Sequence, residues 1–317
     1  MPLRFTLRQI EYFVAVGEEG SIAQAAGKVN VSSPSISAAI TQLEAEFGLQ
    51  LFARKHAHGL ALTQAGRQFL VQAKTLLAEA DRLNGLANEI IGRVRGPLNV
   101  GCLLTFAQIV LPHLRRSFIT RYPDVQFRQF ERDQQAIFDG LRNAELDIAL
   151  TYDLEIPPDL EFVPLFDLPP YVMLPDNHDL ANRRSISVAE LAPYPMILLD
   201  LPYSGPYFLS VFSDAGVTPN VVERTRDMEV MKSLVANGFG YSIANIRHSS
   251  DCAADGKRLR FVPLTGNMRP MRMGLMSASG AKNTLTVRAL IDHCRETITP
   301  QLTPGLRVRV SSSYDDE

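Results

Sequence analysis

Residues 21–47 read Ser-Ile-Ala-Gln-Ala-Ala-Gly-Lys-Val-Asn-Val-Ser-Ser-Pro-Ser-Ile-Ser-Ala-Ala-Ile-Thr-Gln-Leu-Glu-Ala-Glu-Phe, and this stretch decides the fold of the N-terminal part of the chain. Two short helical patterns flank a tight turn at Asn30, which is typical of a helix-turn-helix. Ser21 is suited to cap a first helix that runs through Val29. A second helix is expected to begin at Ser33-Pro34, because a serine cap followed by proline favours a helix start.

The second helix has two contrasting faces. Ile36, Ile40, Leu43 and Phe47 recur at helical spacing and are expected to be buried. The opposite face carries short side chains that fit a major groove and touch base edges. These are Ser35, Ser37, Ala38 and Thr41.

The flanking segments indicate a winged arrangement. Upstream, Leu7, Ile10, Phe13, Val14 and Val16 form the apolar stripe of a packing helix. Downstream, a basic turn at residues 54–59 ends in glycine between two apolar runs and predicts a wing that meets phosphates. The residues expected to contact DNA are Ser21, Ser33, Pro34, Ser35, Ser37, Ala38, Arg54 and Lys55.

In these segments the chain resembles the LysR-type transcriptional regulators. The motifs that carry the resemblance are Leu7-Arg8-Gln9-Ile10-Glu11-Tyr12-Phe13, Gly20-Ser21, Ala25-Ala26, Leu43-Glu44, Phe47-Gly48, Leu51-Phe52 with Arg54, and Leu62-Thr63 with Ala65-Gly66. Their order along the chain is more specific than any single motif. The chain departs from the family where glutamine usually stands at Ser33 and a basic or polar pair at Ala38-Ala39, so hydroxyl groups, apolar contacts and DNA shape are left for base readout.

Composition sets the remaining limits. The chain has 317 residues, 46% of them hydrophobic and 21% charged, with a net charge of −2, which is ordinary for a protein of two or three domains. Without an apolar run of roughly 18 residues or a basic segment followed by an apolar one, we expect no membrane span and no signal peptide, and hence a cytoplasmic protein. Cys102, Cys252 and Cys294 are too few and too dispersed for a disulfide framework or a zinc site.

The N-terminal part is not clearly basic, unlike most nucleic-acid modules. Over residues 1–62, Arg4, Arg8, Lys28, Arg54 and Lys55 are balanced by Glu11, Glu18, Glu19, Glu44 and Glu46. We therefore expect phosphate contacts of modest strength.

A long amphipathic pattern follows from Thr63, a suitable cap, to Gly92. A helix of this length usually buries its apolar stripe against a second copy of itself, which agrees with the linker helix through which the resembled family dimerises. The sequence thus predicts a winged helix-turn-helix domain at 1–62 and a linker helix at 63–92 that holds a homodimer, and two such dimers are expected to form a tetramer.

Residues 93–298 alternate strand and helix patterns, which predicts α/β layers with parallel sheet. Two such sets in succession predict two lobes. The family resemblance extends here through motifs such as Glu145-Leu-Asp-Ile-Ala-Leu150 and Gly238-Phe-Gly240, and implies an effector-binding domain similar to periplasmic binding proteins of type 2. Residues 299–317, rich in Pro, Ser and acids, are expected to form a flexible tail.

An effector site is expected between the lobes. Thr105 and Ser204 each follow a strand and open a helix, where a hydroxyl group and free amides attract anions. A small organic acid held between them is the predicted ligand, and the resemblance places the family's pocket at matching positions. The residues expected to surround it are Thr105, Phe106, Gln134, Tyr152, Tyr203, Ser204, Tyr207 and Asn245, the last at a position where the family often has proline.

Two other function classes remain open at this point. An enzyme acting in the cleft is one, although no pairing of nucleophile and base is visible, and a regulator that senses oxidants through Cys102 is the other. The close pair His56 and His58 lies in the expected wing and is interpreted as solvated or phosphate-facing. No catalytic residue, metal site or cofactor is predicted; the predicted partners are double-stranded promoter DNA, an organic acid and further copies of the chain.

Overall fold

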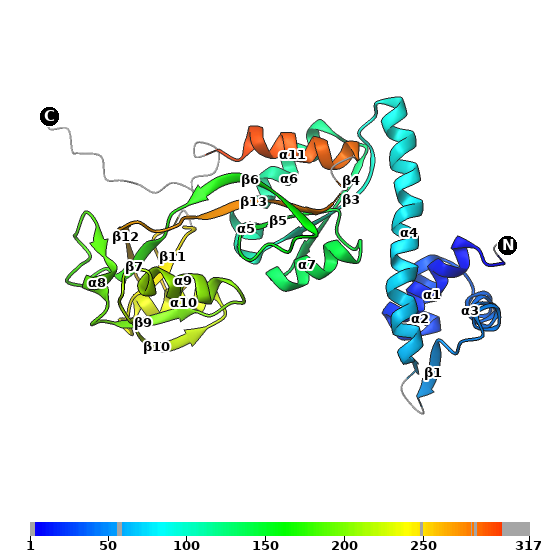
Figure 1. Cartoon of the computed structure of the whole chain (residues 1–317), viewed down its shortest axis with the longest axis horizontal. Helices are drawn as coiled ribbons and strands as arrows, with labels where there is room; N and C mark the ends of the chain where they lie inside the picture. Colours follow the sequence, from blue (N-terminus) through cyan, green and yellow to red (C-terminus); the bar gives the residue numbers. More distant parts are fainter. Residues whose placement is uncertain (1–3, 56–58, 248–249, 280, 282–283, 300–317) are drawn as a thin grey trace. The chain divides into compact units, whose positions relative to one another are not determined.

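The computed structural model describes residues 4–55, 59–247, 250–279, 281 and 284–299. The chain forms two compact units, one comprising residues 1–93 with 142–145 and the other residues 94–141 with 146–317. Figure 1 labels most of the elements of both. Among the described residues, no helix is both long and apolar enough to cross a membrane.

The first unit is a helical domain with a two-stranded hairpin. Its elements are α1 (Leu7–Glu19), α2 (Ile22–Val29), α3 (Ser33–Phe47), β1 (Phe52–Lys55), β2 (Gly59–Leu62) and α4 (Gln64–Ile91). Ser21 caps α2 by accepting a hydrogen bond from the Gln24 amide, and Asn30 ends it in the left-handed region at φ 55°. Both features of the predicted helix-turn-helix are confirmed.

The start of α3 differs by one residue from the prediction. Its cap is Ser32, whose hydroxyl group accepts a hydrogen bond from the Ser35 amide, while Ser33 is already the first helical residue and Pro34 follows it. Both serines precede the proline, and the sequence pattern alone does not distinguish them. The shift leaves the faces of α3 unchanged.

The apolar faces of the helices meet in one core. Ile10 and Phe13 of α1 are buried against Ile36 and Leu43 of α3. Two expected core residues remain partly accessible: Leu7 is 45% exposed, and Phe47 is 37% exposed although its ring packs against Phe5 and Phe69.

Two contacts fix the hairpin to this core. The Glu44 carboxylate accepts hydrogen bonds from the amides of Leu51 and Phe52 at 2.8 and 3.1 Å. Gly66, in the first turn of α4, lies against the backbone of Leu51, so that an added Cβ would come within 2.0 Å of the Leu51 carbonyl oxygen. Any larger residue at position 66 would separate α4 from the hairpin.

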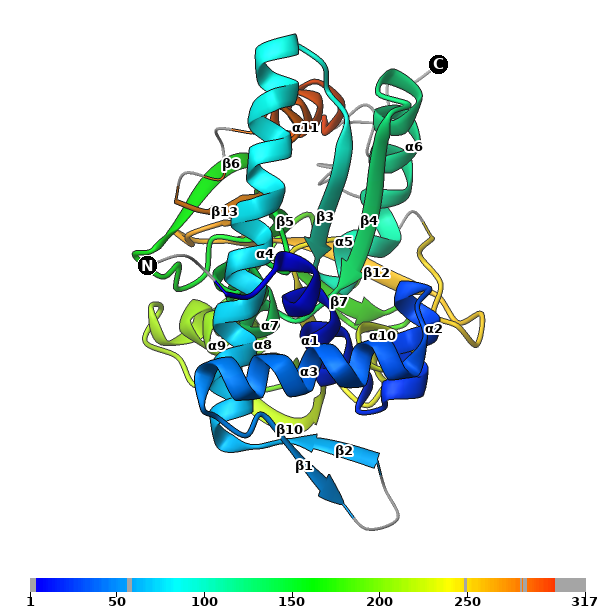
Figure 2. The ribbon, with the colours of Figure 1, turned by 90° about the vertical axis from the view of Figure 1, so that its right-hand side faces the viewer.

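The hairpin is antiparallel, with Phe52 opposite Leu62 and Lys55 opposite Gly59. Figure 2 shows it extending from the N-terminal end of α4. The turn at residues 56–58, including the His56 and His58 pair, lies outside the described residues. Thr63 caps α4, because its hydroxyl group accepts a hydrogen bond from the Gly66 amide at 2.9 Å.

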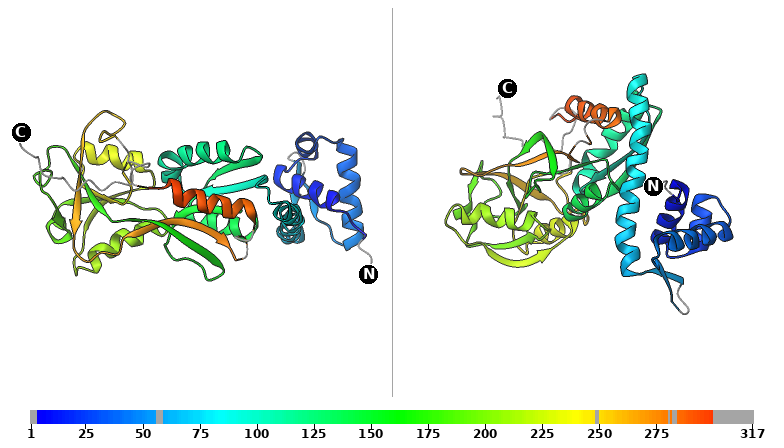
Figure 3. Two further views of the ribbon diagram at one scale, coloured as in Figure 1. Left: turned by 90° about the horizontal axis from the view of Figure 1, so that it is seen from above. Right: turned by 45° about the vertical axis from the view of Figure 1, so that its right-hand side comes forward.

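The second unit consists of two lobes. The first lobe is a five-stranded sheet in the order β4-β3-β5-β13-β6, with α6 and α11 on one face and α7 on the other (Figures 1 and 3). Its elements are β3 (Gly96–Cys102), α5 (Leu104–Ile109), α6 (Leu111–Arg121), β4 (Val125–Glu131), α7 (Gln134–Arg142), β5 (Ile148–Tyr152), β6 (Leu160–Leu168), β13 (Met271–Ala278) and α11 (Leu285–Thr297).

The second lobe is built around a four-stranded sheet in the order β11-β7-β12-β8 and the parallel pair β9 and β10. Helices α8 and α9 pack on one side and α10 on the other. Its elements are β7 (Tyr171–Pro175), β8 (Ile186–Ser187), α8 (Val188–Leu191), β9 (Pro195–Leu199), α9 (Ser204–Ser213), β10 (Asn220–Thr225), α10 (Met228–Ala236), β11 (Ser242–Ala244) and β12 (Leu259–Thr265).

The chain passes between the lobes twice, from β6 to β7 and from β12 to β13. The expected parallel pairing is present between β3 and its neighbours β4 and β5. The sheets are nevertheless mixed, because β13 runs antiparallel to both β5 and β6, and β7 runs antiparallel to β11 and β12. The two lobes are thus joined side by side by two crossing segments, an arrangement that leaves a cleft between them. The predicted tail lies, apart from Thr299, outside the described residues.

Candidate functional site

Helix α3 presents the surface predicted to meet DNA. Pro34, Ser35, Ser37 and Ala38 are exposed, and Ser33 is half-buried. They lie opposite the buried Ile36, Ile40 and Leu43. A face of short side chains on a helix anchored by its other face is suited to enter a major groove, because nothing long holds the backbone away from the base edges.

The hydroxyl groups of this surface are not equally available. Ser21 serves as the cap of α2 and is half-buried, and the Ser35 hydroxyl lies 2.7 Å from that of Ser32. Among the described residues, the Ser37 hydroxyl has no hydrogen-bond partner, although the Ser37 carbonyl accepts from Thr41. The Ser33 hydroxyl also has no partner among the described residues, but Ser33 is half-buried, so the exposed Ser37 hydroxyl needs least rearrangement to contact a base.

Several acidic side chains of this unit are neutralised within it. Lys28 Nζ lies 3.0 Å from Glu18 and 2.9 Å from Glu19, and Lys74 lies 3.1 Å from Glu18. Glu44 is occupied by backbone amides of the hairpin. Three of the five acidic residues counted in the sequence, Glu18, Glu19 and Glu44, thus have structural partners, which reduces their repulsion of a phosphate backbone. Arg54 and Lys55 lie on β1, but their side chains are outside the described residues.

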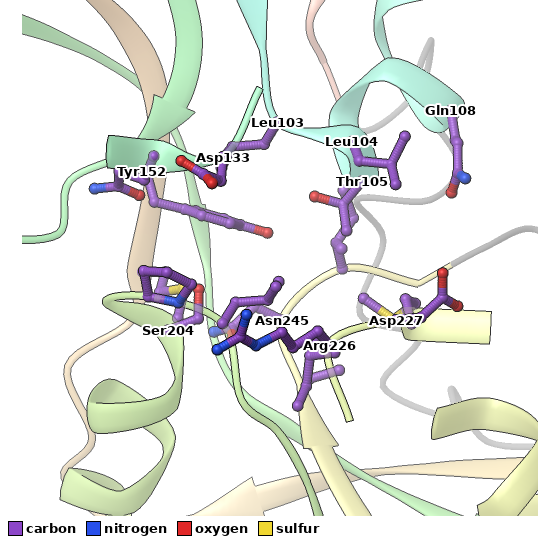
Figure 4. A pocket seen from close by; sticks show the side chains of 18 of the residues that line it. Leu103, Leu104, Thr105, Gln108, Asp133, Tyr152, Ser204, Arg226, Asp227 and Asn245 are labelled. Carbon is purple, nitrogen blue, oxygen red and sulfur yellow. The ribbon is translucent and has the colours of Figure 1, made fainter. Parts of the chain in front are cut away.

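The second unit contains a cavity of about 330 Å³ between its two lobes (Figure 4). One wall comes from the first lobe and includes Leu103, Leu104, Thr105, Gln108, Gln134 and Tyr152. The facing wall comes from the second lobe and includes Leu199, Ser204, Phe208, Arg226, Met228 and Asn245. Apolar side chains dominate, with a few polar groups among them, which is the usual character of a small-molecule site.

Five of the eight residues predicted around the effector line this cavity: Thr105, Gln134, Tyr152, Ser204 and Asn245. Phe106, Tyr203 and Tyr207 do not. Phe106 follows Thr105 on α5 and therefore points about 100° away around the helix. It is fully buried behind the wall, 4.7 Å from the ring of Tyr152 between centroids.

Tyr203 and Tyr207 connect parts of the second unit instead. The Tyr203 hydroxyl group donates to Gln135 Oε1 on α7 at 2.6 Å, and its ring packs against Phe138 of the same helix, so Tyr203 bridges the lobes. Tyr203 has φ 67°, an unfavourable conformation for a bulky residue that these contacts hold in place. The Tyr207 hydroxyl group donates to the Arg269 carbonyl in the β12–β13 connection.

The two helix starts differ from the predicted symmetrical anion site. At α5 the cap is Leu103, and among the described residues the amides of Leu104 and Thr105 have no acceptor. At α9, by contrast, the Ser204 and Gly205 amides donate to Pro202 and Leu201, and Pro206 has no amide hydrogen. Only the α5 side offers free amides, so at α9 the Ser204 hydroxyl is the group left to contact a ligand.

Arg226 is a cavity residue that the sequence analysis missed. It follows β10 directly and is exposed, and among the described residues it has no ion-pair or hydrogen-bond partner. Its position after a parallel strand is the same signal that identified Thr105 and Ser204. Figure 4 shows its guanidinium group on the second-lobe side, across from Thr105 and Tyr152.

The acidic residues at the cavity have local roles. The Asp133 carboxylate accepts from the Ala136 amide in the first turn of α7, and the Asp227 carboxylate accepts from the Glu229 and Val230 amides as the cap of α10. Glu229 lies 3.1 Å from Lys232. Two lining cations remain: Arg226, and Arg132 on the first-lobe side, whose guanidinium carbon lies 6.0 Å from the centre of the Phe130 ring. Arg226 is the lining cation that the second lobe offers to a ligand.

Burial shifts two titratable groups at the first-lobe wall. Burial raises the pKa of the Tyr152 phenol, so this hydroxyl group remains a hydrogen-bond donor at neutral pH. Burial also raises the pKa of the Cys102 thiol, which lies behind the wall and donates to the Leu103 carbonyl. A thiol kept protonated is a poor nucleophile toward peroxide, which argues against oxidant sensing at Cys102.

Comparison with known proteins covers both units. Residues 7–67 match the family described as bacterial regulatory helix-turn-helix protein, lysR family, and residues 92–299 match the LysR substrate binding domain. The crystal structure of HinK, a LysR family transcriptional regulator from Pseudomonas aeruginosa, is 34% identical with a TM-score of 0.63, covering 95% of this chain and 99% of that one.

Two further relatives agree with these matches. A putative LysR family regulator, the PA01 protein of Pseudomonas aeruginosa, is 33% identical with a TM-score of 0.63, over 94% of this chain and all of that one. The Hca operon transcriptional activator HcaR of Escherichia coli K12 is 31% identical over 75% of this chain and 80% of its own length.

Proposed function

Because the chain belongs to the LysR family of bacterial transcriptional regulators, we propose that a small organic acid binds between the lobes of its effector-binding domain and changes how the protein engages its promoter. The protein is a DNA-binding transcriptional regulator and not an enzyme. The observation that carries the proposal is the cavity of about 330 Å³, lined mainly by apolar groups with Thr105, Ser204 and Arg226 on facing walls.

The charge of the ligand is argued from the donors that the cavity offers. The Leu104 and Thr105 amides, the Thr105 and Ser204 hydroxyl groups and the Arg226 guanidinium can all donate hydrogen bonds, and Arg226 also carries a full positive charge. A carboxylate accepts such bonds and neutralises the arginine. The apolar walls around Leu103 and Phe208 then suit a hydrocarbon or aromatic body.

The DNA contacts are proposed for the exposed face of α3 and for the hairpin. Ser33, Pro34, Ser35, Ser37 and Ala38 would face the major groove. Arg54 and Lys55 on β1 would approach phosphates, and Ser21 would support the start of α2. A regulator acting on promoter DNA in this way would work in the cytoplasm.

A homodimer is proposed through α4, with a tetramer as the larger assembly. What supports it is that Leu76 and Leu83 remain 38% and 69% exposed although they lie on one face of a helix of 28 residues. Exposed leucines at this spacing are suited to a symmetric helix pair. The acid would act by binding two assembly states with different affinity, which shifts their equilibrium on DNA.

The experiment is calorimetric titration of the full-length protein with a panel of carboxylates and their methyl esters. A hydrogen bond to a charged group contributes roughly 1.5–3 kcal/mol, so Thr105→Val should weaken binding of the best acid about ten- to hundredfold while preserving shape. Thr120→Val is the matched control, because Thr120 is exposed on α6 outside the cavity. Equal binding of acid and ester, or an unchanged affinity in Thr105→Val, would refute the carboxylate proposal.

A further inference from the structure

Asn245 carries a buried hydrogen-bond acceptor that nothing in the described part of the chain satisfies. The residue follows β11, is 5% exposed and lines the cavity. Its Oδ1 is one of four buried side-chain atoms without a partner among the described residues, the others belonging to Thr151, Tyr241 and His293. Asn245 is the one of these residues that lines the cavity.

The neighbours of Asn245 determine which way its amide points. Its Nδ2 lies 2.7 Å from the Leu168 carbonyl oxygen, which can only accept a hydrogen bond. Nδ2 also lies 3.3 Å from the Tyr207 hydroxyl oxygen, whose own hydrogen is donated to the Arg269 carbonyl. Turning the amide over would place Oδ1 against two acceptors. The amide nitrogen is therefore fixed in the wall, and Oδ1 is left without a partner.

We infer that Asn245 selects effectors that carry a hydrogen-bond donor, a hydroxyl or an amino group, in addition to the carboxylate. A carboxylate has no hydrogen to offer Oδ1 at neutral pH, so the anion and the donor must be separate groups of the ligand. Leaving a buried acceptor unpaired weakens a complex, whereas pairing it with a ligand hydroxyl or ammonium group restores the bond. This inference rests on the proposed carboxylate effector and adds the second functional group.

Asn245 is one of several polar residues that line the cavity, and its Oδ1 has no partner among the described residues. The Tyr152 phenol and Ser204 hydroxyl line the same cavity, and Figure 4 shows Tyr152 on the wall opposite Ser204 and Asn245. The carboxylates of Glu131, Asp133, Asp227 and Glu229, which also line the cavity, have partners within the fold. Asn245 Oδ1 differs, because it is a neutral acceptor held rigid by its two Nδ2 contacts. A rigid acceptor discriminates well, since it cannot rearrange to suit a ligand that lacks the donor.

The test uses sets of acids that differ only in the donor. Suitable sets are 3-phenylpropanoate, 3-phenyllactate and phenylalanine; 4-methylpentanoate, 2-hydroxy-4-methylpentanoate and leucine; and benzoate with its three monohydroxy derivatives, each with methyl esters. In the wild-type protein, at least one hydroxy or amino acid should bind roughly ten- to hundredfold more tightly than its unsubstituted parent. Comparing the hydroxy and amino members identifies which donor is preferred.

Two variants assign the preference to Asn245. Asn245→Leu removes Oδ1 at similar size and should reduce the preference to less than about threefold. Tyr207→Phe removes the neighbouring hydroxyl group, which lies outside the cavity, and should retain the preference because Nδ2 keeps its bond to Leu168. If circular dichroism shows that Asn245→Leu is unfolded, the wild-type ratios decide the question.

The outcomes separate this inference from the proposed function. Parent acids that bind as tightly as their hydroxy and amino derivatives would overturn the role proposed for Asn245. The proposal of a carboxylate effector would then still stand. If no acid binds, or if esters bind as well as acids, the carboxylate proposal fails and the inference falls with it. A preference that survives in Asn245→Leu also overturns the inference.

Discussion

Replacing both Leu76 and Leu83 of α4 with glutamate should separate the proposed dimer. The two residues are seven positions apart, which on a helix is about 10 Å along one face. At 38% and 69% exposure they leave about one leucine side chain uncovered per copy. Burying that surface in both copies would contribute roughly 3–6 kcal/mol, so its loss should raise the dissociation constant at least about a hundredfold. The introduced carboxylates would add repulsion.

The assay is sedimentation velocity from nanomolar to micromolar concentration, followed by binding to DNA fragments that the wild-type protein selects from a genomic library. We expect a monomer that loses specific DNA binding. Val71→Glu is the matched control: Val71 is 42% exposed on the same helix but lies about 140° around it from Leu76, so this variant should associate normally. An unchanged assembly in the double variant, or equal loss in Val71→Glu, would refute the placement of the interface.

Three further predictions concern other parts of the chain. Arg226→Gln should weaken binding of carboxylates about tenfold or more and leave binding of their methyl esters nearly unchanged in calorimetry, whereas an equal effect on both would show that Arg226 does not recognise the charge. Ser37→Ala should change the sequence preference in a DNA selection experiment without changing the salt dependence of binding; an identical preference would remove Ser37 from base readout. Burial alone would raise the pKa of Asp153, but hydrogen bonds from Arg272 and Arg269 outweigh it and hold that pKa below its usual value. The carboxylate therefore stabilises the fold above about pH 4, and this contribution is lost as the pH falls. Asp153→Asn should therefore unfold more easily at pH 7 and show a weaker loss of stability in acid by thermal denaturation, and parallel pH profiles would contradict this.

The helix-turn-helix could be predicted nearly to the residue because its signals are local. The cap at Ser21, the left-handed turn at Asn30 and the proline at the start of α3 each act within one turn of helix. The error in the helix start, Ser33 in place of Ser32, arose because adjacent serines are equally good caps.

The strands of the effector domain were harder to predict where pairing is non-local. β13 (Met271–Ala278) is buried along most of its length and pairs with β5 and β6, more than a hundred residues earlier in the sequence. A strand buried on both faces lacks the alternation of apolar and polar residues that marks a half-exposed strand. The periodicity of apolar residues therefore did not predict the antiparallel strands that make both sheets mixed. It also did not predict the second passage of the chain between the lobes.

At the cavity, too, features set by local sequence were predicted and features set by distant residues were not. Thr105 and Ser204 were identified because they follow strands, and Arg226 was missed although it follows β10 in the same way. Phe106 and Tyr207 were misplaced because proximity in sequence does not fix the direction of a side chain on a helix. The free acceptor of Asn245 depends on Leu168 and Tyr207, which are 77 and 38 residues away in the sequence, so only the folded structure reveals it.

The central claim is that binding of an acid in the cavity changes the affinity of the protein for DNA, which binds at α3, and that DNA in turn changes the affinity for the acid. The most direct measurement is the affinity of the full-length protein for its best-binding acid, determined by calorimetry with and without saturating selected DNA. The account predicts that DNA changes this affinity, and that the acid changes the affinity for DNA by the same factor, because coupling between two sites is reciprocal. Identical acid affinities with and without DNA, with the acid bound in the cavity, would contradict the account.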